Sequence, residues 1–583
     1  MTEVKETELS ARSEAIVTAG LRPELFAGPS VLSSSKTLII TALVLLVITG
    51  LGFRAVGLSA EGLSEDELNK LNAVEDYRAH GLTGANGEHP LLMKALQAGS
   101  IILTDKWNSG SFVASHGAYY IQTETALRLP SALFGALTAL LIYLLTAELF
   151  GSEVALISAA LWAFDPNAIG FNRIAKEDTF LLFFFLLANV FWLRGQRIAE
   201  STNRTPNLYY WATAVAFGAM IASKYLPHLF AITISYYWIF QNIPETRWRL
   251  GKKRLFIFFV IMGIAFLLFN PTILLPETWH QMGLFAAHKV GSHDGYEFMG
   301  KIYKNRFEDW LRGTPFYFYL LFTWIKLPLL ALAGLIVGFP LLFWRKLGDG
   351  RYFILFWLFF WFFGFSFLGG KFTRYYTTAL PAVLITSALG IQFTGQWMAK
   401  RLSSLWSERA RNLLPAALAV LVIANSLVDS VQSAPHFRLF TNTLGGGKAQ
   451  AGYYFPHDDF YDASMCDVIS EIARQARPGA HVASESPLVA SFYAQRAKRP
   501  DLVCVSVSDP SALKQLTTGD FIIVARGRRY FSNIVALTAL EKTGPPDLRF
   551  LLGDVPSADV FIVNNTRIEV LNEAVRQMES SRK

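Results

Sequence analysis

Cysteine is scarce in this sequence, and the common metal-binding motifs are missing. The 583 residues include two cysteines, Cys466 and Cys504, which lie far apart near the C-terminus. Two cysteines without a spacing motif are more often buried thiols. The alternative is one disulfide between them, which requires that this region is extracytoplasmic. Neither CxxC nor HExxH occurs. We therefore expect no metal site and no cofactor, and leave the use of a divalent cation open.

Three other features are also missing. Residues 1–36 are polar and have no small-residue cleavage site after a short apolar core, so they predict a cytoplasmic tail before an uncleaved anchor. The C-terminal part contains no GxGxxG or P-loop, so nothing there indicates nucleotide binding. No internal repeat is visible, whereas a transporter or flippase would more often show two related halves.

Apolar residues, by contrast, are abundant. They make up 52% of the chain, and 47 residues are Phe. Apolar runs of about 20 residues, long enough to cross a bilayer core, recur along the sequence. They predict a mainly α polytopic membrane protein with eleven spans, at about 37–53, 126–149, 153–170, 178–193, 209–223, 225–241, 255–275, 315–341, 352–370, 375–395 and 412–431.

The distribution of charge predicts the orientation. Four loops on one side hold fifteen basic and four acidic residues, and they are 194–208, 242–254, 342–351 and 396–411. The first loop on the other side, 54–125, holds five basic and nine acidic residues. Lys and Arg favour cytoplasmic loops, so this bias predicts that the N-terminus lies in the cytoplasm. The expected location of the protein is the plasma (inner) membrane. These basic loops account for the net charge of +8, so the charge does not indicate binding to nucleic acid.

These patterns divide the chain into three parts: the tail (1–36), a transmembrane domain (37–431, with outer loops 54–125 and 276–314) and an extracytoplasmic domain (432–583). In the third part, strand-like and helix-like segments alternate, which predicts a soluble α/β domain with a mainly parallel sheet. We expect this domain to be structural or to face an acceptor, not to be a second catalytic centre.

Ionisable residues near the spans gather at the predicted outer face. The loop SEDELNKLNAVEDYRAHGLTGANGEHPLLMK, residues 64–94, opens with three acids and closes with His89, Pro90 and Lys94. Arg128, Arg173, Glu177, Asp178, Lys224, Lys371 and Arg374 are placed at the same face. Charges at spans are costly and point to function. Such a cluster suits glycosyl transfer from a phosphorylated lipid, which needs a carboxylate base and cations for the leaving phosphate.

The loop's Asp-Glu pair and His-Pro-x-x-x-Lys resemble the first outer loop of the protein O-mannosyltransferase family, a GT-C class of polyprenyl-phosphate-sugar glycosyltransferases. Four later stretches are similar to that group and to its aminoarabinose transferase relatives: 127–135, 173–184, 223–227 and 374–381. The resemblance implies that Asp66 is the general base and that its neighbour Glu67 is the second catalytic residue. It also implies donor-phosphate or substrate contacts from His89, Lys94, Arg128, Arg173, Asp178, Lys224, Arg374 and Tyr375.

The expected partners follow from the same resemblance. They are a polyprenyl-phosphate-linked sugar donor, membrane lipids and an acceptor that is a protein, lipid A or an envelope glycan. The sequence departs from the family in two places: His-Pro-Leu-Leu stands at 89–92 instead of His-Pro-Pro-Leu, and loop 276–314 is too short for the domain inserted in eukaryotic members. The sugar and the acceptor therefore stay open, and a lipid or sugar transporter is the more distant alternative.

Overall fold

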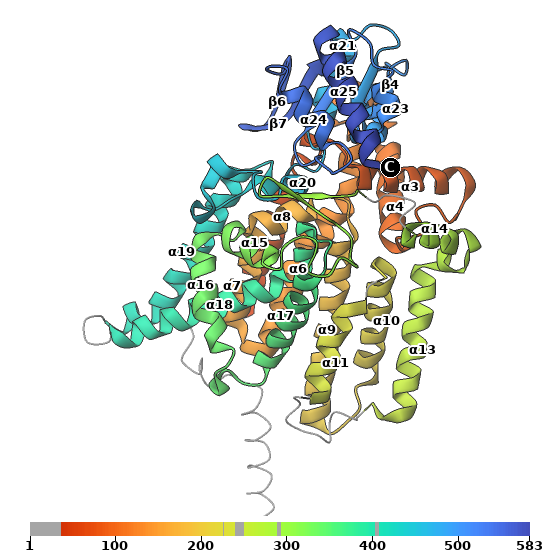
Figure 1. The fold of residues 1–583 in the computed structure, drawn as a ribbon. Coiled ribbons are helices and arrows are strands. Elements are labelled where there is room, and N and C mark those ends of the chain that lie inside the picture. Colours follow the sequence, from red (N-terminus) through yellow and green to blue (C-terminus); the bar gives the residue numbers. More distant parts are fainter. Residues whose placement is uncertain (1–35, 226, 240–249, 288–292, 403–406, 583) are drawn as a thin grey trace, which may run out of the picture.

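The computed structural model describes residues 36–225, 227–239, 250–287, 293–402 and 407–582. Nearly all of the predicted tail and the first part of loop 242–254 lie outside these residues. Figure 1 shows a bundle of roughly aligned helices with a smaller region of strands and helices at one end of it. The chain is mainly helical, as predicted.

Helices dominate residues 36–433. In chain order they are α2 (Lys36–Ala55), α3 (Glu65–His80), α4 (Leu91–Asn108), α5 (Ser111–Ser115), α6 (Thr123–Phe150), α7 (Ser152–Phe164), α8 (Pro166–Asn172), α9 (Glu177–Thr202), α10 (Asn207–Ser223), α11 (Phe230–Ile239), α13 (Gly251–Phe269), α14 (Pro276–Ala286), α15 (Phe318–Lys326), α16 (Leu329–Leu341), α17 (Gly350–Phe367), α18 (Leu380–Arg401) and α19 (Glu408–Ser433). A hairpin of β1 (Tyr296–Phe298) and β2 (Lys301–Tyr303) lies between α14 and α15.

Five helices in the described residues are long and apolar enough to cross a membrane: Lys36–Ala60, Thr123–Phe150, Glu177–Thr202, Gly350–Phe367 and Arg411–Ser433. A sixth span results if α7 and α8, which meet at 60°, are counted together. Pro166 causes this bend because it lacks an N–H and disfavours helical backbone before it, and Asp165 then caps α8. Each of the eleven predicted segments contains a helix, but eleven spans stay a prediction.

Close backbone contact joins α16 to α18. A Cβ atom at Gly338 or at Gly390 would collide with backbone atoms of the facing helix. Small residues let helices approach in a lipid environment, where close packing stabilises their association. This contact brings α18 against α16, and the 3-10 helix η7 (Thr373–Thr378) immediately precedes α18.

Beyond α19 the chain turns through short helices and then forms a five-stranded sheet. The short helices are η8 (Phe437–Leu439), η9 (Thr443–Gly445), η10 (Gly447–Gln450) and α20 (Pro456–Phe460). The later elements are α21 (Met465–Gln475), β3 (His481–Ser484), α22 (Pro487–Arg496), β4 (Val503–Ser506), α23 (Pro510–Leu513), β5 (Phe521–Ala525), α24 (Ile534–Glu541), β6 (Leu548–Leu552), β7 (Val555–Ile562) and α25 (Asn565–Arg582).

The sheet is mixed, in the order β4-β3-β5-β7-β6, so the expectation of a mainly parallel sheet is wrong. Strand β3 pairs in parallel with β4 and β5, whereas β7 pairs antiparallel with β5 and β6. The two residues Gly553 and Asp554 connect β6 to β7, and a connection this short permits only an antiparallel pair. Both cysteines in this region are free and partly buried.

The region of strands shares a hydrophobic core with the loop of residues 54–125. Leu63, Leu68 and Val74, in and beside α3, pack in one cluster with Val468 and Ile469 of α21. A second cluster, between the other face of the sheet and helices α24 and α25, does not include the loop. Helix α3 and the residues just before it therefore pack against both the helix bundle and the C-terminal region.

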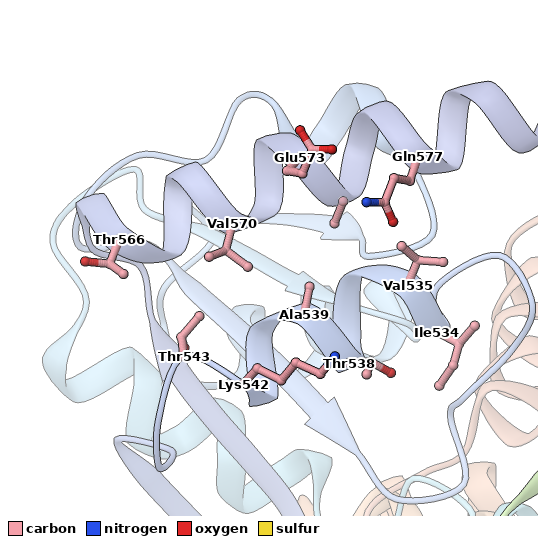
Figure 2. Close-up of a pocket in the computed structure, with 11 residues that line it drawn as sticks. Ile534, Val535, Thr538, Ala539, Lys542, Thr543, Thr566, Val570, Glu573 and Gln577 are labelled. Atoms are coloured by element: carbon pink, nitrogen blue, oxygen red, sulfur yellow. The ribbon is translucent and has the colours of Figure 1, made fainter.

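A groove of about 800 Å³ lies between α24 and α25 (Figure 2). Apolar side chains such as Val535 and Val570 line it together with Lys542 and Glu573. None of the residues that line it is a predicted site residue.

Candidate active site

The acidic triplet forms the first turn of α3. The hydroxyl of Ser64 accepts a hydrogen bond from the backbone N–H of Glu67, and the Glu67 carboxylate accepts one from the backbone N–H of Ser64 (3.0 Å). This capping box satisfies backbone groups at the helix start, and acids in the first turn complement the helix dipole. The pattern Ser-x-x-Glu thus fixes where α3 begins and how its acids project.

Glu67 is fully buried and fully engaged. Its two carboxylate oxygens accept hydrogen bonds of 2.7 Å from Nε and Nη2 of Arg128, and Ala175 donates its backbone N–H at 2.9 Å. Arg128 in turn donates to the carbonyls of Leu58, Glu61 and Gly62. The pair ties α3 to α6, as a buried structural ion pair does. The catalytic role predicted for Glu67 and the phosphate-binding role predicted for Arg128 stay predictions.

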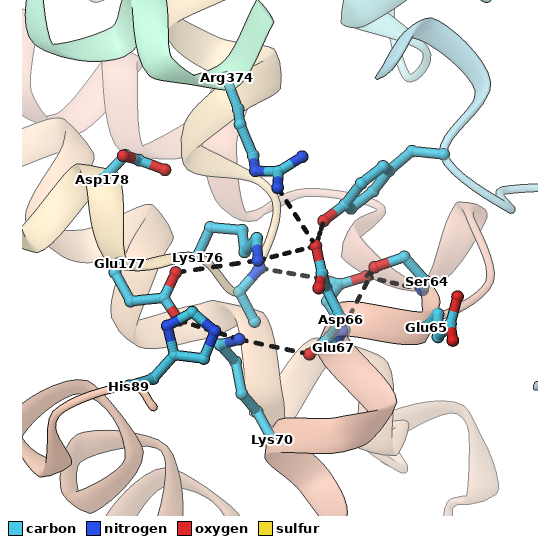
Figure 3. Close-up of polar contacts among 12 residues, drawn as sticks. Ser64, Glu65, Asp66, Glu67, Lys70, His89, Lys176, Glu177, Asp178 and Arg374 are labelled. Carbon is cyan, nitrogen blue, oxygen red and sulfur yellow. Dashed lines mark hydrogen bonds and ion pairs between the residues drawn. The ribbon is translucent and has the colours of Figure 1, made fainter. Parts of the chain in front are cut away.

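Asp66, by contrast, is open: 36% of its side chain is exposed. Its Oδ2 atom lies 2.7 Å from Nζ of Lys176 and 3.6 Å from Nη2 of Arg374, and Figure 3 shows these side chains converging on the carboxylate. The hydroxyl of Tyr461 donates to the same oxygen at 2.6 Å. Within the described part of the chain, no hydrogen bond to Oδ1 is found.

A buried ionic layer lies beside Asp66. Glu177 pairs with Lys70 at 2.9 Å, and Nδ1 of His89 lies 3.2 Å from the same carboxylate. Lys176 lies 3.9 Å from Glu177 and so lies between the two acids (Figure 3). Burial holds the pKa of His89 well below its usual range, so His89 is neutral at pH 7. The predicted residue His89 is thus brought to the site.

Asp178, Lys224 and Tyr375, all predicted site residues, form a second group. Asp178 pairs with Lys224 at 2.6 Å, and Nζ of Lys224 lies 4.5 Å from the ring centroid of Tyr375. The Arg374 guanidinium is 5.4 Å from the same ring. A cation over an aromatic face is held without using up its N–H donors.

Arg374 stands out among the predicted cations because its N–H groups are barely used. Its single hydrogen bond within the described residues is a long one, 3.5 Å from Nη1 to Oδ1 of Asp458. Asp458 is itself held by the hydroxyl of Tyr296 (2.6 Å) and the backbone N–H of Thr373 (2.9 Å). Arg374 therefore has donors available for an anion.

Lys94 and Arg173, also predicted to bind the donor, do not reach Asp66. Nζ of Lys94 donates to three carbonyls, of Ala85, Asn86 and His89. Arg173 donates to the carbonyls of Phe53, Arg54, Val56 and Gly57. These bonds fix the backbone at residues 85–89 and 53–57. Burial lowers the pKa of Lys94 to about 7.

The charges around Asp66 set its protonation. Burial by itself would raise the pKa of Asp66, but Lys176, Arg374 and Lys70 outweigh burial and hold it well below the usual range. Burial lowers the pKa of Lys176 to about 8, although Asp66 acts in the opposite direction. At neutral pH the site therefore presents an ionised carboxylate beside cations.

Sequence reasoning missed Lys70, Lys176, Asp458 and Tyr461. Lys70 follows Asp66 by four residues, a spacing that places both on one helix face and was a usable signal. Lys176 lies within the stretch 173–184 and precedes two acids. Asp458 and Tyr461 are distant in sequence, and no local pattern links them to α3. In the described residues, no group of three or more His, Cys, Asp or Glu side chains is arranged to hold a metal ion.

Comparison with known proteins agrees with this chemistry. Residues 66–288 match the family model for dolichyl-phosphate-mannose-protein mannosyltransferases, and the match begins at Asp66. This segment, less than half of the chain, is therefore similar to that family. No curated protein matches the sequence.

Several solved structures resemble this chain. ArnT from Cupriavidus metallidurans bound to undecaprenyl phosphate is 16% identical, with a TM-score of 0.47, over 90% of this chain and 98% of that one. The apo oligosaccharyltransferase of Archaeoglobus fulgidus is 13% identical, with a TM-score of 0.47, over 84% and 70%. The S. cerevisiae Pmt1-Pmt2 protein O-mannosyltransferase complex bound to the sugar donor is 21% identical, with a TM-score of 0.29, over 44% and 35%.

Proposed function

We propose that this protein is a membrane glycosyltransferase. It moves a sugar from a polyprenyl-phosphate donor to an acceptor hydroxyl at the extracytoplasmic face, with inversion and with Asp66 as general base. One observation carries the proposal. Asp66 is a partly exposed acid in the first turn of α3, and it lies 3.6 Å from an arginine whose N–H donors are barely used. A base and an anion site are thus adjacent.

Arg374 and Lys176 are suited to bind the donor phosphate. Guanidinium N–H groups pair with phosphate oxygens in a bidentate manner, and the ammonium of Lys176 adds a second positive charge beside Asp66. Lys224, held by Asp178 and Tyr375, supplies a third cation in the same region. Preformed cations stabilise the charge that develops on a leaving group without reorganisation during the reaction.

In the proposed step the acceptor oxygen attacks the anomeric carbon of the donor sugar. The bond from that carbon to the phosphate oxygen breaks, and its electron pair leaves with polyprenyl phosphate. The acceptor proton passes to Oδ1 of Asp66, which accepts no hydrogen bond within the described residues. Negative charge accumulating on the phosphate raises the pKa of a nearby carboxylate, so the base strengthens as the leaving group departs.

We infer inversion because, in the described part of the chain, the other acids next to the Asp66 cluster are held by partners of their own. Retention by double displacement needs a carboxylate that can form a covalent intermediate with the sugar. Glu177 is paired with Lys70, Asp178 with Lys224, and Asp458 is held by Tyr296 and Thr373. A single displacement at Asp66 is the reaction that this arrangement favours.

The acceptor class is tested by supplying the purified protein in lipid nanodiscs with a panel of polyprenyl-phosphate sugars and an extract of cell-envelope proteins, lipids and glycans. We expect release of polyprenyl phosphate to accompany labelling of one of these fractions, identified by mass spectrometry. A protein, lipid A or another glycan as the labelled fraction distinguishes the acceptors. If no donor of the panel is consumed in the presence of the full extract, the proposal fails.

The proposed orientation makes a separate prediction. Because Lys and Arg concentrate in loops on one side, residues beyond 431 should lie outside the cytoplasm. A reporter that is active only in the cytoplasm should be silent when fused after residue 435 and active when fused in loop 342–351. Activity after residue 435 would reverse the assignment of the active-site face.

The proposed role of Lys176 predicts a loss of activity on the alkaline side. A lysine with a pKa of about 8 is charged below that pH and becomes neutral above it, so kcat/KM for the donor should fall as the pH rises through about 8. Lys176→Arg keeps the charge at every accessible pH and should move this fall to higher pH. An unchanged alkaline limb in Lys176→Arg would remove Lys176 from the phosphate site.

A further inference from the structure

The residues that follow α20 adopt an unusual backbone. Tyr461 and Asp462 have φ values of 47° and 60°, and neither is glycine. Left-handed backbone is uncommon for such residues and costs free energy, so two in succession persist only where surrounding contacts hold them. Both side chains are buried.

The C-terminal region supplies those contacts. The Asp462 carboxylate accepts hydrogen bonds from Nε (2.7 Å) and Nη2 of Arg528, which follows β5, and from the hydroxyl of Ser486 (3.1 Å), which follows β3. Its other contact is with α3, because the backbone N–H of Glu65 donates to it at 3.3 Å. Asp462 therefore links the ends of two strands to the first turn of the helix that carries Asp66.

Tyr461 then reaches the proposed base directly. Its hydroxyl donates to Oδ2 of Asp66 at 2.6 Å, on the oxygen that also faces Lys176 and Arg374. Burial, together with the adjacent Asp66, holds the pKa of Tyr461 well above its usual range, so the hydroxyl keeps its proton and remains a donor. Three donors thus lie on one side of the carboxylate.

We propose that Tyr461 is a positioning residue through which the C-terminal region orients the catalytic carboxylate, turning Oδ1 of Asp66 toward the acceptor. The inference rests on the proposed role of Asp66 as the base and extends it to a residue more than 390 positions away in sequence. It also gives the region beyond α19 a part in the reaction, whereas its sequence indicated only an accessory. Oδ2, already facing Lys176, Arg374 and Tyr461, is a poor proton acceptor, which leaves Oδ1.

The test is Tyr461→Phe in the full-length protein, in nanodiscs, with the donor of the panel that the wild type consumes. Removing one hydrogen bond to a charged group should lower kcat by roughly 10- to 100-fold. Binding of polyprenyl phosphate should be unchanged, because Lys176 and Arg374 remain. Tyr453→Phe is the matched control: this tyrosine lies in the same segment, is 41% exposed and should behave as wild type.

The pH profile separates positioning from a merely structural role. Lys176, Arg374, Lys70 and Tyr461 all face Asp66 and favour its ionised form. Losing the tyrosine donor should move the acid limb of kcat/KM to higher pH. Wild-type kcat with an unmoved acid limb, or a loss of stability with an unmoved acid limb, would overturn the inference. Near-normal turnover of Asp66→Asn, measured beside it, would instead overturn the proposed function itself.

Discussion

Asp66→Asn is expected to lower turnover by about 10²- to 10⁴-fold, the contribution typical of a positioned general base. The amide keeps the size of the side chain and can still accept a hydrogen bond from Tyr461, but it cannot take the acceptor's proton. Binding of polyprenyl phosphate should be retained or tightened, because a negative charge beside Lys176 and Arg374 is removed. Steady-state kinetics with the consumed donor and titration with polyprenyl phosphate measure the two effects separately.

Glu65→Gln is the matched control for this variant. Glu65 lies in the same helix turn, is 30% exposed at its side chain and contacts His293 at 3.3 Å. Substitutions at such positions usually change stability by less than about 0.5 kcal/mol, and turnover should stay near the wild-type value. A strong loss in Glu65→Gln with a mild one in Asp66→Asn would mean that the wrong acid of the triplet has been assigned as the base.

Glu67→Gln is expected to act on stability. It removes the charge that compensates Arg128 in a fully buried pair, and breaking such a pair costs about 3–5 kcal/mol. Unfolding in mixed detergent, followed by circular dichroism, should show this loss as a large shift of the transition. Asp66→Asn, whose side chain is partly exposed, should unfold close to the wild type.

The same measurement decides whether Glu67 has a catalytic role. A Glu67→Gln protein that is as stable as the wild type but inactive would support the catalytic role predicted for Glu67 from the Asp-Glu pair. We expect the opposite result. Glu67→Gln should be less stable than the wild type, and the activity of its folded fraction should fall less than in Asp66→Asn. Arg128→Lys should destabilise in the same direction, because a lysine cannot form the two parallel bonds to Glu67.

Local patterns made several elements predictable. Apolar runs located helices within every predicted span, and Ser64 with Glu67 located the start of α3. The strand-like segments HVASES, DLVCVSVSD, DFIIVARG and ADVFIVNN predicted four of the five strands in the C-terminal sheet. The fifth, β6, precedes a Gly-Asp turn, and reading that turn would also have predicted the antiparallel hairpin.

The roles of individual cations were not predictable, because a charge near a membrane span looks the same whether it binds a ligand or backbone carbonyls. Arg128, Arg173 and Lys94 were predicted, like Arg374, to contact the donor. In the structure each of these three donates hydrogen bonds to several backbone carbonyls. Tyr461 contacts Asp66 only because the chain returns from α19 and is held by the C-terminal region. Such long-range contacts leave no local periodicity or spacing in the sequence.

Product analysis of the wild-type reaction tests the central claim most directly. A donor of defined anomeric configuration is supplied with the acceptor fraction, and the linkage formed is determined by nuclear magnetic resonance while released polyprenyl phosphate is quantified. The account predicts one polyprenyl phosphate released for each sugar transferred, and an inverted configuration at the anomeric carbon. Retention of configuration, or transfer without release of polyprenyl phosphate, would contradict a single displacement with Asp66 as the base.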